Sequence, residues 1–191
     1  MTRALVISGG GSKGAYAVGV INKLHQQFVN LNFDVFVGTS TGSLIIPLLA
    51  VKKYDLLTEL YTTQTTDKII IKYNIGDRIS DHSIFNSAPL WTLIEKYFTD
   101  ELYEEIKVQQ QKMYFTTVCL QTGQLFVFTT DDNPMPVTGY ELISIQNAVH
   151  FRKAILASAS QPVFMPPVMV NKNITGISNQ NYQFVDGGVR E

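Results

Sequence analysis

The fold is indicated most directly by Val35-Phe-Val-Gly-Thr-Ser-Thr-Gly-Ser-Leu-Ile-Ile-Pro-Leu-Leu49. This segment starts inside an apolar run, residues 33–37, that stops at Gly38, and it ends with apolar residues at helical spacing. Between them, Gly38-Thr39-Ser40-Thr41-Gly42 matches G-x-S-x-G, the nucleophile elbow, in which a serine lies on a tight turn from strand to helix. This context makes Ser40 a candidate nucleophile, with the helix N-cap of an ordinary turn as the alternative.

Upstream of this stretch the same order of elements occurs once more. Residues 4–7 (Ala-Leu-Val-Ile) suit a buried strand, and they are followed by Gly9-Gly10-Gly11-Ser12-Lys13-Gly14. The next apolar positions recur at steps of four, three and four, which is one stripe of a helix: Ala17, Ile21, Leu24 and Phe28. The first fifty residues therefore predict the opening of a parallel sheet covered by helices.

The glycine run predicts an anion site, because successive backbone N–H groups can point into one concavity. The anion can be the oxyanion of an acyl-transfer intermediate. It can also be a phosphate, since Gly9, Gly11 and Gly14 satisfy the dinucleotide fingerprint G-x-G-x-x-G. That fingerprint requires an acidic residue at the end of the second strand, whereas Asp34 lies near the start of its strand. The oxyanion interpretation is the stronger, and the dinucleotide interpretation stays open.

A third motif, Asp186-Gly187-Gly188, ends a short strand predicted at residues 182–185. A carboxylate followed by two permissive glycines can approach Ser40 and accept its proton. An isolated Asp-Gly-Gly is more often an ordinary turn, so this motif gains its meaning from the other two.

The rest of the chain predicts further helices and one hairpin. Helical spacing covers residues 54–61, 88–98 and 147–159, and two β-branched runs flank Thr122-Gly123. Residues 68–73 suit a strand or a mobile loop. No linker divides the chain, so we expect a single domain over residues 1–191.

Composition excludes several classes of protein. With 15 Lys and Arg against 16 Asp and Glu among 191 residues, the net charge of -1 excludes a strongly basic nucleic-acid binder. The single cysteine, Cys119, excludes an internal disulfide framework and a Cys-rich zinc site, and alternation along its strand predicts a buried thiol. No signal peptide is recognisable, and the longest apolar stretch, residues 44–51, is much shorter than the ~20 residues of a membrane span. We therefore expect a cytoplasmic protein, with peripheral contact to a membrane left open.

Together these motifs resemble the patatin-like phospholipase family. The resemblance rests on the glycine-rich loop Gly9–Gly14, the elbow Gly38–Gly42 about thirty residues on, and the late Asp186–Gly188. The small-residue segment Ala157–Pro162, with Phe164, Pro166 and Pro167 after it, is also similar to the family's pattern. The likeness runs from about Arg3 to Gly188, nearly the whole chain.

The resemblance implies a fold and an activity. The fold is an α/β three-layer α/β/α sandwich with a mostly parallel central sheet, as in FabD-like and lysophospholipase-like proteins, and the catalytic domain is expected to continue beyond Glu191. The implied activity is that of a serine lipid acyl hydrolase of the phospholipase A or lysophospholipase type, acting on a phospholipid or other acyl lipid through an acyl-enzyme. Neither a cofactor nor a metal ion is expected.

The family pattern also implies residue roles. Ser40 is the nucleophile and Asp186 the general base of a Ser-Asp dyad. Gly9, Gly10 and Gly11 form the oxyanion hole. The supporting motif residues are Lys13, Gly14, Gly38, Gly42, Gly187 and Gly188. The alternatives are a non-catalytic lipid- or partner-binding protein on the same fold, and a dinucleotide-binding protein that uses Gly9–Gly14.

A Ser-His-Asp triad requires an imidazole as base, and three histidines are available. His25 lies several helical turns beyond the glycine loop, His82 in a polar segment, and His150 on a predicted helix. None is expected to be catalytic, which agrees with a dyad. Leu44, Ile45 and residues 164–166 are candidates to line an acyl channel, with core packing as the simpler alternative for each.

Overall fold

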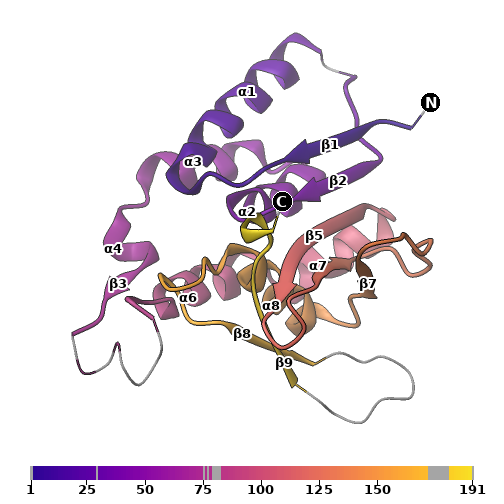
Figure 1. Cartoon of the computed structure of the whole chain (residues 1–191). Coiled ribbons are helices and arrows are strands. Elements are labelled where there is room, and N and C mark those ends of the chain that lie inside the picture. The colour runs from indigo at the N-terminus through magenta and orange to yellow at the C-terminus, as the bar shows by residue number, and fades with distance from the viewer. Residues whose placement is uncertain are drawn as a thin grey trace.

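In the computed structural model the chain folds around a mixed sheet with flanking helices (Figure 1). The structure describes residues 2–28, 30–74, 76, 78, 83–171 and 181–190. Within those residues the sheet has seven strands, and a separate two-stranded sheet lies beside it. The strands of the main sheet are β1 (Ala4–Ile7), β2 (Val35–Gly38), β5 (Lys112–Cys119), β6 (Leu125–Thr129), β7 (Glu141–Ser144), β8 (Val168–Asn171) and β9 (Asn181–Asp186).

Helices follow and connect these strands. They are α1 (Gly14–Gln27), α2 (Thr41–Ala50), α3 (Tyr54–Thr63), α4 (Thr66–Ile69), α6 (Ala88–Tyr97), α7 (Asp100–Val108) and α8 (Ala148–Ala159). Two short 3-10 helices, η1 (Gly11–Lys13) and η2 (Gly187–Val189), lie within two of the glycine motifs. The small sheet is the antiparallel pair β3 (Ile71–Lys72) and β4 (Phe85–Asn86).

The order of strands is β1-β2-β5-β6-β7, with β1, β2 and β5 parallel to one another. β6 turns back antiparallel to β5, β7 is parallel to β6, and β8 pairs with β9. β9 is antiparallel to β5, so the chain returns late to its central strand. The predicted α/β fold, a central sheet with flanking helices, is confirmed.

The strand β5 places the three glycine motifs at one point. β6 pairs with residues 114–118 of β5 and thereby occupies one edge of that strand. β2 pairs with residues 112–115 and β9 with residues 117–119, so both must lie along the other edge. Because β2 is parallel and β9 antiparallel to β5, their carboxyl ends point toward each other. The register leaves two steps of β5 between these ends, roughly 7 Å.

One face of the sheet is packed against α2 and α8. On β5, Phe115 is fully buried and its ring meets that of Phe151 of α8 edge to face, with ring centroids 5.7 Å apart. α2 is buried along nearly its whole length, which explains its continuous apolar sequence. On the opposite face of β1, Val6 is 67% exposed. The helices α2 and α8 therefore anchor the elbow and the small-residue segment in the core.

Most predicted elements are confirmed, and some elements were not predicted. The predicted hairpin is β5–β6, and the predicted helices correspond to α1, α2, α3, α6 and α8. Residues 68–73 divide between the end of α4 and β3. The helices α4 and α7 and the strands β4, β7 and β8 were not predicted. Among the described helices, none combines the length and apolar character needed to cross a membrane.

Candidate functional site

The turn at Ser40 has the strained geometry of a nucleophile elbow. Ser40 adopts φ 55° and ψ -123°, a backbone conformation that residues other than glycine rarely adopt. The two motif glycines permit the sharp turn: a Cβ at Gly38 would lie 2.8 Å from the carbonyl oxygen of Gly42, and one at Gly42 would collide with the carbonyl oxygen of Ile7. The spacing G-x-S-x-G is therefore required by the approach of α2 to β1 and β2.

Two buried serines hold the backbone of Ser40. Its N–H donates to Oγ of Ser158 at 3.2 Å, and its carbonyl oxygen accepts a hydrogen bond from Oγ of Ser43 at 2.6 Å. Both serines are fully buried. No role was predicted for Ser43, and Ser158 was predicted only as part of a small-residue segment. The i, i+3 spacing of Ser40 and Ser43 is a local signal that could have identified the first of them.

The glycine loop lies directly against Ser40. A Cβ at Gly9 would be 2.9 Å from Cβ of Ser40 and 3.6 Å from its Oγ. Gly10 and Gly11 are exposed, and neither N–H donates a hydrogen bond to any residue that the structure describes. Lys13, also exposed, closes the loop through its N–H, which donates to the carbonyl oxygen of Gly10 at 3.1 Å.

The beginning of α1 is wedged against the beginning of α2. A Cβ at Gly14 would lie 2.5 Å from Oγ1 of Thr41 and 2.7 Å from the ring of Tyr61. The hydroxyls of Thr41 and Tyr61 are hydrogen-bonded at 2.8 Å, and burial raises the pKa of Tyr61 to about 12. This packing fixes where the glycine loop enters its helix.

Asp186 lies at the end of β9, opposite the elbow, and is 6% exposed. Its Oδ1 accepts the N–H of Gly188 at 2.8 Å, and its own N–H donates to the carbonyl oxygen of Ser160 at 2.9 Å. Gly187 packs on Thr116, where a Cβ would be 2.7 Å from the carbonyl oxygen. The structure thus places Asp186, Gly187 and Gly188 at the same part of β5 as the elbow, at the end of the opposing strand β9.

Thr116 lies under both turns. Its hydroxyl is hydrogen-bonded to that of Thr39, the residue before Ser40, at 2.6 Å. A Cβ at Gly188 would come within 3.8 Å of the methyl group of the same Thr39. The elbow, the glycine loop and the Asp-Gly-Gly turn are therefore brought together, as the three motifs predicted.

The histidines that the structure describes lie away from Ser40. His25 stacks on Tyr54, with ring centroids 4.0 Å apart, and lies eleven residues along α1 from Gly14, roughly 16 Å. His150 lies eight residues from Ser158 on α8, roughly 12 Å. Burial, with a smaller contribution from Lys153, lowers the pKa of His150 to about 4. His82 lies outside the described residues.

Three further predicted residues are placed by the structure. Cys119 is a buried free thiol, as its strand pattern predicted. Ile45 is fully buried in the core, whereas Phe164 is 46% exposed. Asp34 stands at the start of β2, where its Oδ2 accepts the N–H of Arg3 at 2.8 Å, so it lies at the end of β2 remote from the glycine loop.

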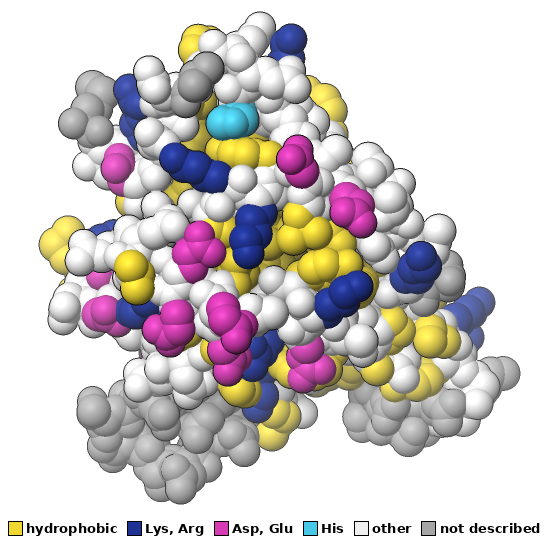
Figure 2. Space-filling model, turned by 180° about the vertical axis from the view of Figure 1, so that it is seen from behind, with side chains coloured by type: hydrophobic (Ala, Val, Ile, Leu, Met, Phe, Trp, Pro, Cys, Tyr) yellow, Lys and Arg dark blue, Asp and Glu magenta, His cyan; other side chains and the backbone are white. Residues whose placement is uncertain are grey.

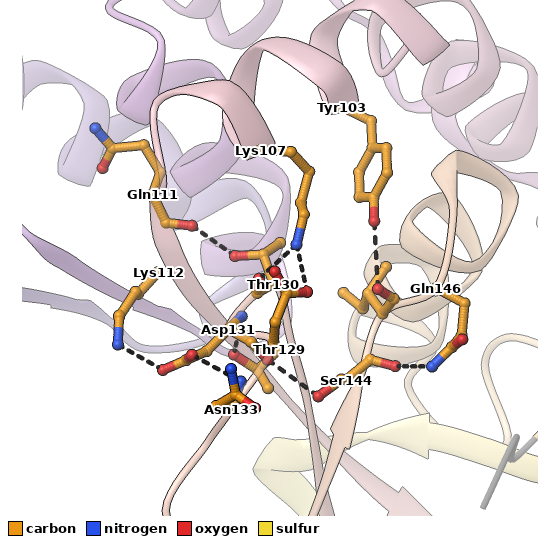
Figure 3. Close-up of polar contacts among 12 residues, drawn as sticks. Tyr103, Lys107, Gln111, Lys112, Thr129, Thr130, Asp131, Asn133, Ser144 and Gln146 are labelled. Atoms are coloured by element: carbon orange, nitrogen blue, oxygen red, sulfur yellow. Dashed lines mark hydrogen bonds and ion pairs between the residues drawn. The ribbon is translucent and has the colours of Figure 1, made fainter.

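A polar cleft at the other end of β5 is separate from this site. It has a volume of about 310 Å³ and lies between the end of α7, the start of β5 and the segment after β6. Its two lysines are paired: Lys112 with Asp131 at 2.8 Å, and Lys107 with Asp132 and the carbonyl oxygen of Thr130 (Figure 3). Exposed pairs of this kind contribute little to stability, and the cleft adds nothing to the chemistry at Ser40.

Comparison with known proteins decides the family. The family model described as "Patatin-like phospholipase" matches residues 5–191. The chain belongs to the patatin-like phospholipase family. Among solved structures, that of VipD from Legionella pneumophila aligns with 100% of this patatin-like chain. The alignment covers 46% of the VipD chain, with a TM-score of 0.60 and 14% sequence identity. The likeness to VipD concerns the fold.

Of three curated relatives, two are named a phospholipase or a probable lipid hydrolase. The chain is 24% identical over 184 residues to the uncharacterized protein R571 of Acanthamoeba polyphaga mimivirus, covering 94% of this chain and 59% of that protein. It is 24% identical over 194 residues to the probable lipid hydrolase 463L of Invertebrate iridescent virus 6, covering 98% of this chain and 60% of that protein. It is 28% identical over 108 residues to the cUMP-AMP-activated phospholipase of Escherichia coli, covering 54% of this chain and 31% of that protein. The patatin-like chain thus spans no more than about 60% of the length of these relatives.

The strain at Ser40 is testable without catalysis. Ser40→Ala keeps a Cβ in the left-handed region, whereas Ser40→Gly removes the strain. Glycine also raises the conformational entropy of the unfolded chain, which offsets part of the gain from removing the strain. We therefore expect the free energy of unfolding of Ser40→Gly to be higher than that of Ser40→Ala by only roughly 1 kcal/mol. Urea denaturation measures the difference. A glycine variant less stable than the alanine variant would contradict strain at this position.

The lowered pKa of His150 predicts a loss of stability in acid. The imidazole of His150 has a pKa near 6.5 in the unfolded chain and about 4 in the folded chain. Between these two pH values it is protonated in the unfolded chain and neutral in the folded chain. The stabilisation is therefore complete above pH 6.5 and is lost as the pH falls toward 4, by roughly 2 kcal/mol at pH 5. Denaturation between pH 7.5 and 5 should show a steeper decline for the parent than for His150→Gln. Equal slopes would show that the buried imidazole is not responsible.

Proposed function

We propose that the chain is a serine lipid acyl hydrolase of the phospholipase A or lysophospholipase type. The observation that carries this proposal is the meeting of β2 and β9 on one edge of β5, which sets the Ser40 elbow opposite Asp186. Family membership supports a lipid substrate, and two relatives are named a phospholipase and a probable lipid hydrolase.

In this mechanism Oγ of Ser40 attacks the carbonyl carbon of an acyl ester, and Asp186 accepts the serine proton. The alcohol leaves, and an acyl-enzyme remains on Ser40. Asp186 then takes a proton from a water molecule, which attacks the acyl carbon and restores the free serine. Each step returns its proton to the leaving oxygen, so the dyad ends as it began.

The glycine loop supplies the oxyanion hole. The N–H groups of Gly10 and Gly11 are exposed and have no partner among the described residues, and Gly9 lies against Ser40. Preorganised donors of this kind stabilise a transition state by about 3 kcal/mol each. Of the histidines that the structure describes, His25 lies roughly 16 Å along α1 from Gly14 and His150 roughly 12 Å along α8 from Ser158, which supports a base other than histidine.

The catalytic assignment is tested with a fluorophosphonate probe and p-nitrophenyl esters. We expect Ser40→Ala to lose both labelling and hydrolysis, and Asp186→Asn to lose hydrolysis by at least roughly 100-fold, because a general base contributes that much. Asp34→Asn, which alters an exposed carboxylate at the far end of β2, is the matched control and should retain full activity.

Unchanged hydrolysis in Asp186→Asn would overturn the role of Asp186 as base. A parent protein that takes no label would favour the non-catalytic binding protein instead. A rise in melting temperature with NAD(P) or FAD would favour the dinucleotide-binding alternative.

Peripheral contact with a lipid surface is the second part of the proposal. Val163 and Phe164 lie three and four residues after Ser160 in the chain. Their side chains are 65% and 46% exposed. Their carbonyl oxygens accept the N–H groups of Ile84 and Phe85 at 2.9 and 2.8 Å, and Val163 holds φ 72°. A β-branched residue in the left-handed region is strained, and here that strain accompanies an apolar side chain turned to solvent.

The charges do not suggest an electrostatic membrane site. On the face drawn in Figure 2, described Lys and Arg side chains are interspersed with Asp and Glu. With a net charge of -1, contact with a bilayer would depend on apolar side chains.

The variant Val163→Ser/Phe164→Ser should therefore bind phosphatidylcholine vesicles several-fold more weakly, with little dependence on salt, while hydrolysis of a soluble ester stays unchanged. Co-sedimentation measures the binding. Val149→Ser is the control, because Val149 is 50% exposed at the opposite end of α8. Equal loss of vesicle binding in both variants would contradict a specific role for residues 163–164.

A further inference from the structure

The end of α8 contacts the backbone of both residues of the proposed dyad. Oγ of Ser158 accepts the N–H of Ser40 at 3.2 Å, and two residues later the carbonyl oxygen of Ser160 accepts the N–H of Asp186 at 2.9 Å. We propose that residues 158–160 form a bridge that sets the position of Ser40 relative to Asp186, and that Ser158 is a positioning residue for the nucleophile. This inference rests on the function proposed above.

The bridge is rigid because α8 is packed in the core. Ala154, Ile155 and Ala157 are fully buried, and the ring of Phe151 lies edge to face against Phe115 of β5. A helix held in this way cannot shift one end without disturbing the sheet below it. The hydroxyl of Ser158 is thus a fixed acceptor, and it lies on a different element from the one that carries the nucleophile.

Ser40 needs such an acceptor because its backbone is strained. At φ 55° and ψ -123° the peptide units on either side of Ser40 must be held from outside. Ser43 holds the carbonyl side through its hydroxyl, and Ser158 holds the N–H side. Without Ser158 the N–H loses its partner, and the elbow can rotate toward a relaxed conformation in which Oγ no longer faces the glycine loop.

Ser160 supplies a matched comparison within the same helix end. It is as fully buried as Ser158, but its hydroxyl donates to the carbonyl oxygen of Leu156, one turn back in α8, at 2.8 Å. Only its backbone carbonyl reaches Asp186, and that group survives substitution of the side chain. Ser158→Ala and Ser160→Ala therefore remove the same atom at similar depth, and only the first removes a contact to Ser40.

The experiment measures the second-order rate of fluorophosphonate labelling and the kcat and KM of p-nitrophenyl ester hydrolysis in the full chain. For Ser158→Ala we expect both the labelling rate and kcat to fall roughly 10- to 100-fold with KM unchanged, because small displacements of a reacting atom cost factors of this size. Ser160→Ala should stay within twofold of the parent in both. Ser158→Cys, which keeps the volume but is a weak acceptor, should resemble Ser158→Ala and serves if the alanine variant does not fold.

Each outcome separates the two proposals. A parent protein that is not labelled contradicts the proposed function itself. A parent that is labelled, with Ser158→Ala or Ser158→Cys within twofold of it, overturns the bridge alone. An equal loss in Ser160→Ala also overturns it, because the effect would then come from packing at the end of α8.

Discussion

The constraint on which the site depends is the sharing of one edge of β5 by two strands that run toward each other. β6 occupies the far edge, so β2 and β9 have to lie end to end on the near one. Their carboxyl ends therefore face each other across Thr116. The turn that carries Ser40 at the end of one strand and Asp186 at the end of the other are brought together by backbone pairing alone.

The strained elbow is maintained by a second set of interactions. The backbone of Ser40 is strained, and hydrogen bonds from outside the turn keep it from relaxing. Oγ of Ser43 holds its carbonyl oxygen and Oγ of Ser158 holds its N–H. α8 is buried against β5, which makes its end a firm support for both turns. Stability of the core and geometry of the site are thus coupled through the same helix. This explains why the end of α8, residues 157–160, is rich in small residues: the elbow and the Asp-Gly-Gly turn both approach it closely.

The sequence was sufficient for the parts of the site that lie in motifs of fixed spacing. A Cβ at Gly38 would collide with Gly42 inside the same motif. Gly42 is required by the carbonyl oxygen of Ile7 and Gly9 by the side chain of Ser40, but each glycine still stands at a fixed position in its own motif. Ser158 could not be assigned, because its contact with Ser40 spans 118 residues. The return of β9 to β5 is equally non-local. The helix α7 could have been found, since Thr99 caps it by accepting the N–H of Leu102 at 3.3 Å and two acidic residues follow.

The central claim is that the glycine loop, Ser40 and Asp186 form one acyl-transfer site. A crystal structure of the protein after reaction with an alkyl fluorophosphonate tests it most directly, because the phosphonyl oxygen occupies the place of the oxyanion. We predict a covalent bond to Oγ of Ser40, with that oxygen within about 3 Å of the N–H groups of Gly10 and Gly11. An adduct on another residue, or an oxygen turned away from the glycine loop, would contradict it.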